Sequence, residues 1–483
     1  MREAGKKRVG AYREESGKGG FLKGAVLIAS GGFIAKIIGA LYRIPLTNIL
    51  GGYGMGLYQI VYPVYCILLT VSATGIPSPI AKLTAERIGK KQTVKPLFKT
   101  AMKLFVVVGL VGTALMIALA PFLARMQNSK EVTAGYFALA PSVFLVSAIS
   151  VYRGYFQGKN NMFPTALSEV VEQVVKVAIG LLLARLFRSD VAKAVVFLLL
   201  AVSISELVAL LLMIWLYRRE QRRLPLQNMS LHAEKDGGKY KMRDILRLSI
   251  PVTFSSILLP LSNLIDSVLV VRFLNGFAQD GVALYGLFSG GAITIMNLCV
   301  SVCYGVAVAS VPAVSQAKAE KETETETGDK RKDGKKTKKP SVRKRIFYAL
   351  GLTVAIALPI SLGMYLFAER AVQVVFRSLS GEQLQILTSL TKALALSAFT
   401  LSLVQTLSAC LTAQGKPQYG AVAMLLSVLV KTGTYCLLFR RAVRSVFAVA
   451  YATNLGYLVA FLLDLLYNLY VSKNKKKKAG EKV

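Results

Sequence analysis

Histidine and tryptophan are almost absent from this chain, which has one of each among its 483 residues. The single histidine, His232, lies in a polar loop, so imidazole-based catalysis and histidine metal ligation have little support. Cys299 and Cys303 lie one helical turn apart, but no histidine or carboxylate accompanies them. We expect all five cysteines to be apolar helix residues, with no disulfide framework, no metal and no cofactor.

Charge is also scarce, and it is unevenly distributed. Charged residues make up 18% of the chain, below the roughly 25% of soluble domains, whereas 54% of the chain is hydrophobic. This composition predicts an all-α integral membrane protein with about twelve transmembrane helices. They are expected near residues 22–49, 55–82, 97–124, 133–157, 163–187, 192–217, 245–273, 283–314, 346–367, 385–413, 419–439 and 445–470.

The formal charge of +35 comes from lysines and arginines in particular loops. They gather after the even-numbered predicted helices and in both tails, and such segments mark the cytoplasmic face. We therefore expect an even number of spans, both termini in the cytoplasm and no nucleic-acid partner, while the basic loops could contact anionic lipid headgroups. One segment disagrees, because Arg440, Arg441 and Arg444 would face outward.

The two halves of the chain resemble each other. Gly56 to Glu86 is similar to Ala283 to Glu320, and two later segments share Gln-Gly-Lys where a helix leaves the membrane, at Gln157 and Gln414. This pattern predicts two six-helix lobes related as a parallel internal repeat. The expected parts are a basic tail (1–21), a first lobe (22–217), a linker (218–244), a second lobe (245–470) with a disordered loop (316–345), and a second basic tail (471–483).

The first predicted helix carries two cations at membrane depth. Lys36 and Arg43 lie seven residues apart, and so on nearly the same helix face. A charge there costs about 2.5 kcal/mol or more unless it faces water or a partner. The pair therefore predicts a binding surface for a ligand with separated negative charges, such as a pyrophosphate. Alternatively, the two cations reach opposite interfaces or pair with Asp266.

Glycine and proline residues interrupt the second and eighth predicted helices. Proline frees a backbone carbonyl and bends a helix axis, and glycine adds backbone freedom. We expect hinges at Gly75, Pro77, Pro79 and Pro312.

Other ionisable residues also fall within predicted helices. Glu172 and Lys176 are four residues apart with the acid first, which favours an intrahelical pair. Glu206 lies near the middle of its helix and is either paired with a cation, protonated, or a site for a coupling ion. Arg272 and Asp464 lie near predicted helix ends, where such side chains can reach water. The remaining members of this set are Glu169, Asp266 and Lys431.

The first two predicted helices and a later turn resemble the stage V sporulation protein B and polysaccharide-biosynthesis branch of the multidrug/oligosaccharidyl-lipid/polysaccharide exporter superfamily. The matching runs are AKIIGALYRIPLTNILGGYGMGLYQIVYPVYCILLTVSATGIPSPIAKL and YRGYFQGKNNMFPTA. The resemblance extends over essentially the whole chain and implies two lobes in a V shape, alternating access and a Gram-positive plasma membrane. Many members have fourteen spans, whereas twelve are expected here.

This branch includes lipid II flippases, in which a cationic cavity and basic residues of the first span are essential. Lys36 occupies a matching place, and Arg43 lies one position from the second arginine of that motif. We expect the substrate to contact a set of four residues, and a carboxylate to carry a coupling proton or sodium ion. The substrate set is Lys36, Arg43, Asp266 and Arg272, and the coupling candidates are Glu206 and Glu172.

The resemblance implies a monomeric flippase that moves an undecaprenyl-pyrophosphate-linked glycan, with lipid II first, to the outer leaflet. A teichoic, capsular or spore-cortex unit is an alternative cargo. A cation-coupled multidrug antiporter would need acidic residues in its cavity, and the first two helices offer none. A membrane glycosyltransferase would need a carboxylate pair or histidine near an interface and larger outward loops, so we do not expect an enzyme.

Overall fold

The computed structural model describes residues 18–73, 76–89, 92–223, 257–326, 342–441 and 445–480. Every regular element in these ranges is helical, which confirms the all-α prediction. Nine of the described helices are long and apolar enough to cross a membrane. The chain divides into two compact units, each with its own packing.

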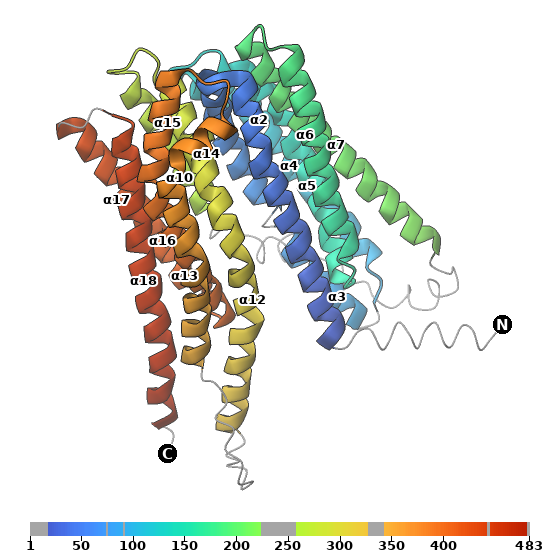
Figure 1. Cartoon of the computed structure of the whole chain (residues 1–483). Coiled ribbons are helices and arrows are strands. Elements are labelled where there is room, and N and C mark those ends of the chain that lie inside the picture. Colours follow the sequence, from blue (N-terminus) through green and yellow to red (C-terminus); the bar gives the residue numbers. More distant parts are fainter. Residues whose placement is uncertain are drawn as a thin grey trace. The chain divides into compact units, whose positions relative to one another are not determined.

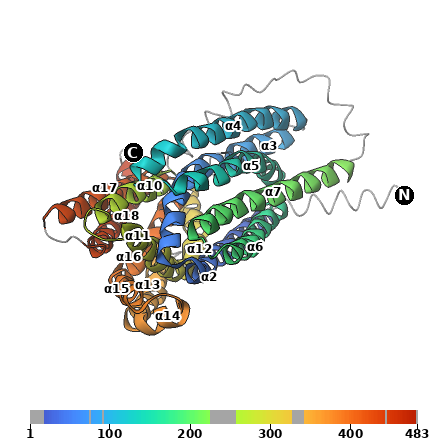
Figure 2. The same cartoon turned by 90° about the horizontal axis from the view of Figure 1, so that it is seen from above.

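The first unit contains the described residues up to Tyr42 and from Ile60 to Leu261. Its helices are both ends of α2 (Lys18–Ala73), α3 (Pro77–Gly89), α4 (Lys95–Met126), α5 (Val132–Gly158), α6 (Phe163–Leu186) and α7 (Val191–Arg223). Helix α5 packs against α3, α4 and α7, and α6 packs against α7 (Figures 1 and 2). Buried apolar side chains of α3, α4, α5 and α7, among them Phe105 and Ile149, form the core of this unit.

The second unit contains Arg43–Gln59 and the described residues from Ser262 onward. Its other elements are α10 (Leu258–Leu274), α11 (Gly281–Tyr285), the π-helix η1 (Gly286–Ala292), α12 (Ile293–Glu326), α13 (Val342–Leu366), α14 (Ala368–Val375), α15 (Gly381–Ala393), α16 (Ala395–Ala413), α17 (Pro417–Arg441) and α18 (Phe447–Gly480). Helix α16 packs against α12, α13 and α18, and α18 packs against α17. Val314, Leu407 and Cys410 are buried where α12 meets α16.

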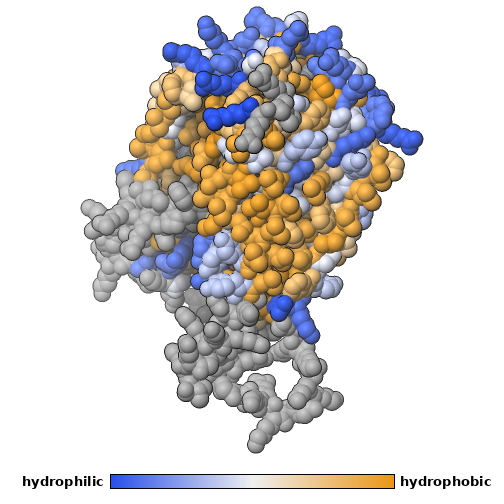
Figure 3. Space-filling view, turned by 90° about the vertical axis from the view of Figure 1, so that its left-hand side faces the viewer, coloured by the Kyte–Doolittle hydropathy of each residue, from blue (hydrophilic) through white to orange (hydrophobic). Residues whose placement is uncertain are grey.

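The surface of the helices is apolar, as a lipid-facing surface requires. Leu429, Leu437 and Leu466 are each 58–60% exposed on α17 and α18. On the face shown in Figure 3, hydrophobic side chains cover a broad area, and hydrophilic side chains gather at one end. A soluble protein rarely exposes so large an apolar area, so these helices are membrane-embedded.

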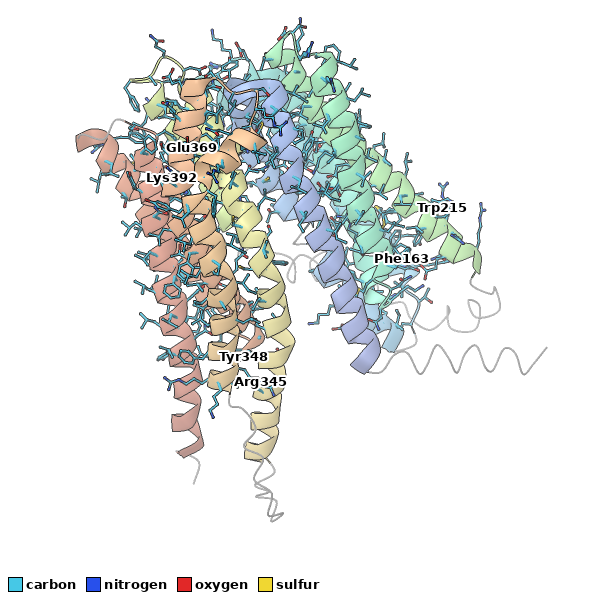
Figure 4. The ribbon with its side chains drawn as sticks, in the orientation of Figure 1. Phe163, Trp215, Arg345, Tyr348, Glu369 and Lys392 are labelled. Carbon is cyan, nitrogen blue, oxygen red and sulfur yellow. The ribbon has the colours of Figure 1, made fainter. Side chains whose placement is uncertain are left out.

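Exposed aromatic side chains accompany arginines at helix ends in both units. The Arg219 guanidinium lies 5.2 Å from the ring centroid of Trp215 on α7, and Phe163 of α6 is also exposed (Figure 4). On α13, Arg343 lies 5.6 Å from the Phe347 ring. Aromatic rings with basic neighbours are typical of the membrane interface, where one part of the side chain is apolar and the other is hydrated.

The pair of helices predicted over residues 22–49 and 55–82 differs from its expected form. Helix α2 continues from Lys18 to Ala73, and only Gly51 departs from helical geometry, at φ 66° and ψ −173°. The second predicted helix does not continue to residue 82, because α2 ends and α3 begins at Pro77. Pro77 and Pro79 thus start a helix, where a missing N–H costs little, and do not bend a continuous one.

The hinge role of all four positions remains a prediction. Gly75 lies outside the described residues. Pro312 lies within α12, but its side chain is also outside the described set.

Several other boundaries also differ from expectation. The helix predicted over 385–413 is two helices, α15 and α16, separated at Leu394. Helices α6 and α10 occupy predicted spans but are not among the nine candidates, and only 17 residues of α10 are described. Helix α12 continues to Glu326 inside the segment expected to be disordered, and residues 327–341 lie outside the described ranges.

Candidate functional site

Arg43 is the described member of the predicted cationic pair. It is half-buried on α2, and its Nη1 donates a hydrogen bond of 3.4 Å to Oγ1 of Thr294 at the start of α12. Its backbone carbonyl accepts a hydrogen bond of 2.8 Å from the Thr47 hydroxyl. Among the described residues, no acidic side chain forms an ion pair with Arg43. Lys36 lies on the same helix, but its side chain is outside the described set.

Asp266 is paired with a residue other than the predicted cations. Its Oδ2 lies 2.5 Å from Nζ of Lys431 on α17, and the same ammonium donates to Ser262 at 2.7 Å. The three side chains are 3–9% exposed, so the ion pair is buried within the second unit. Asp266 therefore neutralises Lys431, while its Oδ1 atom is buried without a hydrogen bond.

Arg272 also belongs to the predicted substrate set and lies on α10, like Asp266. It is exposed in the last turn of that helix. This position agrees with a long cationic side chain that reaches the interface from a helix end. The structure therefore does not bring Arg272 together with the buried Asp266 pair.

A second buried polar cluster lies in the first unit. Arg153 of α5 donates to Glu172 of α6 at 3.1 Å and to the Ser168 hydroxyl at 3.0 Å. Arg153 was not among the candidates from the sequence. Its position within the fourth predicted helix, in the run YRGYFQGKNN, was the available signal.

Glu206 adjoins this cluster. Its Oε1 accepts a hydrogen bond of 2.9 Å from the Tyr65 hydroxyl, and its Oε2 is buried without a hydrogen bond. The charges of Glu172, Arg153 and Lys176 act on it electrostatically. The two coupling candidates thus lie in one network, and Glu206 is hydrogen-bonded to a hydroxyl of the second half of α2.

The expectation that Asp464 reaches water near a helix end is wrong. Asp464 is fully buried, because α18 continues to Gly480 and places this residue well inside the helix. Its Oδ2 accepts a hydrogen bond of 2.6 Å from Ser408 on α16, while Oδ1 has no hydrogen-bond partner. One turn further, Gln414 donates to Asn468 at 2.9 Å. A polar seam therefore joins α16 to α18.

Lys159 of the first Gln-Gly-Lys turn has a structural role. Its Nζ lies 2.8 Å from Glu220 of α7 and 2.9 Å from the Tyr155 hydroxyl. Burial alone would lower the pKa of Lys159, but the hydrogen bonds to Glu220 and Tyr155 raise it above its usual value. The ammonium stays charged and ties the end of α5 to α7.

In the described ranges, no three histidine, cysteine or acidic side chains form a cluster that could hold a metal ion. The cysteines described, all five of them, are free thiols. The arrangement is therefore one of buried ion pairs within each unit and a half-buried arginine with a neutral partner.

Known proteins are similar to this chain over part of its length. The sequence profile described as "Polysaccharide biosynthesis protein" matches residues 21–318. Stage V sporulation protein B of Bacillus subtilis (strain 168) is 29% identical over 305 residues, which cover 61% of this chain and 58% of that protein. The lipid II flippase MurJ of the same organism is 23% identical over 318 residues, which cover 61% and 58%. The matches thus span less than two thirds of these relatives.

Solved structures share the fold. An inward-facing multidrug resistance MATE family transporter of the MOP superfamily aligns with a TM-score of 0.68 at 16% identity, covering 94% of this chain and 99% of that one. A MOP superfamily transporter from Pyrococcus furiosus aligns with a TM-score of 0.61 at 17% identity, covering 93% and 96%. At such identities the likeness concerns the fold alone. The family profile covers well over half of the sequence, and the chain belongs to the polysaccharide biosynthesis protein family.

Proposed function

We propose that this protein is a flippase that moves an undecaprenyl-pyrophosphate-linked glycan from the inner to the outer leaflet by alternating access, with lipid II as the first candidate cargo. The observation that carries the proposal is the state of Arg43. It is half-buried in an apolar helix, and its side-chain hydrogen bond is made to a neutral hydroxyl. Its positive charge is therefore available to an anion, and its planar fork suits the oxygens of a phosphate.

The ion-paired acids favour an anionic cargo over an organic cation. Glu172 is paired with Arg153, and Asp266 is paired with Lys431, so each of these two charges is neutralised inside its own unit. A multidrug antiporter needs a carboxylate that can accept a cationic drug, and these carboxylates already have partners inside their own units. We therefore rank a different lipid-linked polysaccharide unit as the second candidate, ahead of a drug.

In this proposal, Lys36 and Arg43 bind the pyrophosphate while the polyprenyl tail stays in lipid. Asp266 acts on the substrate site only through its ion pair with Lys431. Arg272 contacts lipid headgroups at the membrane interface. Glu206 is the preferred coupling residue, since its second oxygen is buried without a partner and could bind a proton or a sodium ion. Glu172 follows, because Arg153 already neutralises it.

Complementation of a bacterial strain depleted of its lipid II flippase tests the proposal. Wild type, Lys36→Ala, Lys36→Glu and Arg43→Ala are compared at matched membrane expression, with Lys103→Ala as a control because this lysine is exposed on α4. We expect wild type and Lys103→Ala to restore growth and Lys36→Glu and Arg43→Ala to fail. If wild type reaches the membrane but does not restore growth, lipid II is not the cargo. If Arg43→Ala restores growth fully, the anion site is elsewhere.

A further inference from the structure

Glycines bring the segment Arg43–Gln59 of α2 into backbone contact with α11 and η1 of the same unit. A Cβ added to Gly56 would lie 2.1 Å from the carbonyl oxygen of Val282, and one added to Gly286 would lie 2.0 Å from the carbonyl oxygen of Gly52. Real Cβ atoms essentially never approach closer than 3.0 Å. The two backbones can be this close only because both carry glycine, so the distance between α2 and the start of α12 is set by main-chain atoms.

The π-helix η1 then determines which side chains of α12 face α2. It comprises Gly286–Ala292 and leads directly into α12 at Ile293. A π-turn uses i to i+5 hydrogen bonds, so it rotates the helix that follows relative to an uninterrupted α-helix. The Ser289 carbonyl in this turn accepts a hydrogen bond of 3.3 Å from Nε2 of Gln59. The next polar side chain, Thr294, is 1% exposed and meets Arg43.

We propose that Thr294 is a positioning residue that holds the Arg43 guanidinium ready for the pyrophosphate of the cargo. The threonine hydroxyl accepts a hydrogen bond from Nη1 and leaves the positive charge of the guanidinium unpaired. A carboxylate in the same place would neutralise that charge. A long arginine side chain has many rotamers, and fixing it before the ligand arrives lowers the entropic cost of binding. This inference rests on the proposed function, in which Arg43 binds the anion.

Equilibrium binding of undecaprenyl pyrophosphate to the purified full-length protein tests the inference. This probe contains the pyrophosphate and the tail that all the candidate cargos share. The variants are Arg43→Ala, Thr294→Val, Thr294→Ser and the double variant Arg43→Ala/Thr294→Val. Thr391→Val is the matched control, since Thr391 is also 1% exposed in the second unit and its hydroxyl bonds to Leu387 of its own helix.

We expect Thr294→Val to weaken binding about tenfold, which is the size of effect that losing one hydrogen bond to a charged group produces. Thr294→Ser, which keeps the hydroxyl, should stay within about twofold of wild type. Thr391→Val should bind like wild type. In the Arg43→Ala background, Thr294→Val should cause no further loss, because the group that it positions is gone.

The outcomes separate the inference from the proposed function. If Arg43→Ala loses affinity while Thr294→Val binds like wild type, the positioning role is wrong and the anion site stands. If the two substitutions weaken binding additively, Thr294 acts independently of Arg43 and the inference is also wrong. If Arg43→Ala binds like wild type, both the positioning role of Thr294 and the anion site at Arg43 are wrong. Where Thr294→Val does not purify as a folded protein, Thr294→Ala replaces it in the same comparison.

Discussion

Three carboxylates, those of Glu206, Asp266 and Asp464, lie buried in the helical units, and Glu172 is half-buried. Each of the four is bonded to a particular side chain. The partners are of two kinds, cations for Glu172 and Asp266 and hydroxyls for Glu206 and Asp464. A buried charge is tolerated only when it is paired or hydrogen-bonded, because desolvation costs several kcal/mol. These interactions therefore belong to the architecture of each unit. Arg43 is a half-buried cation whose side-chain partner is a hydroxyl, and for this reason we propose it as the residue that binds an anionic ligand.

The buried pair of Lys431 with Asp266 gives a prediction at this scale. Lys431→Met is expected to lower the free energy of unfolding by about 3 kcal/mol or more, because it leaves the Asp266 charge buried without its partner. The double variant Lys431→Met/Asp266→Asn should recover part of the loss, since it removes both charges. The thermal unfolding midpoint of the purified protein in detergent measures both. Arg377→Met, at an exposed arginine of the same unit, should leave the midpoint unchanged. A Lys431→Met midpoint equal to wild type would show that the pair is solvated.

At the scale of elements, short breaks in the helices decide where side chains point. Gly51 interrupts α2, η1 precedes α12, and the two Gln-Gly-Lys turns end α5 and α16. The two turns have the same Gln-Gly-Lys sequence but different backbone conformations. The positive φ falls on Asn160 in the first turn, at 61°, and on Gly415 in the second, at 75°. The first turn is longer before the next helix begins, so a sequence repeat does not ensure the same turn.

The glycine contacts of α2 give a second prediction. Gly56→Ala is expected to destabilise the protein by about 1–3 kcal/mol or more, because its Cβ would overlap the backbone of Val282 and force α11 to move. Gly305→Ala is the control. It lies within α12 with nothing within 4 Å of an added Cβ, so the better helix propensity of alanine should stabilise by up to about 1 kcal/mol.

The measurement is the thermal unfolding midpoint of the two variants beside wild type. Equal midpoints for Gly56→Ala and Gly305→Ala would contradict the close approach. A drop in Gly56→Ala alone would support it, and we expect the same variant to fail in the complementation assay because it displaces Thr294.

At the scale of the whole molecule, the chain divides into two compact units. That each lobe contains six spans stays a prediction. The division does not follow the sequence halves everywhere. The segment Arg43–Gln59 belongs to the second unit, although the rest of α2 belongs to the first. The Asn48 side chain donates to the Val375 carbonyl at 2.7 Å and accepts from the Ser378 hydroxyl at 3.1 Å, which adds to the glycine contacts that hold this segment.

The topology expected from the charge distribution can be tested by thiol labelling. All five native cysteines are replaced first, since they are free thiols. Asn161→Cys and Ser378→Cys, both at exposed positions in connecting segments, are then treated with a membrane-impermeant maleimide in intact cells. We expect Ser378→Cys to react and Asn161→Cys to react only after permeabilisation, because the former follows an odd-numbered predicted helix and the latter an even-numbered one.

Ser445→Cys examines the segment that disagreed with the charge rule, and it should react in intact cells. Labelling of Asn161→Cys before permeabilisation would invert the orientation. Labelling of Ser445→Cys only after permeabilisation would require a different number of spans in the second half.

The sequence by itself determined the membrane-embedded helical class, the internal repeat and the presence of cations in the first helix. Each of these depends on local hydropathy or on residues close together in the chain, and so it can be read without coordinates. Only the tertiary structure determined which side chains pair with one another. Lys431 and Asp266 are 165 positions apart, and Arg43 and Thr294 are 251 apart, so no local pattern could have paired them. It also decided that Asp464 is buried, because burial depends on which helices cover a residue and not on its distance from a predicted helix end.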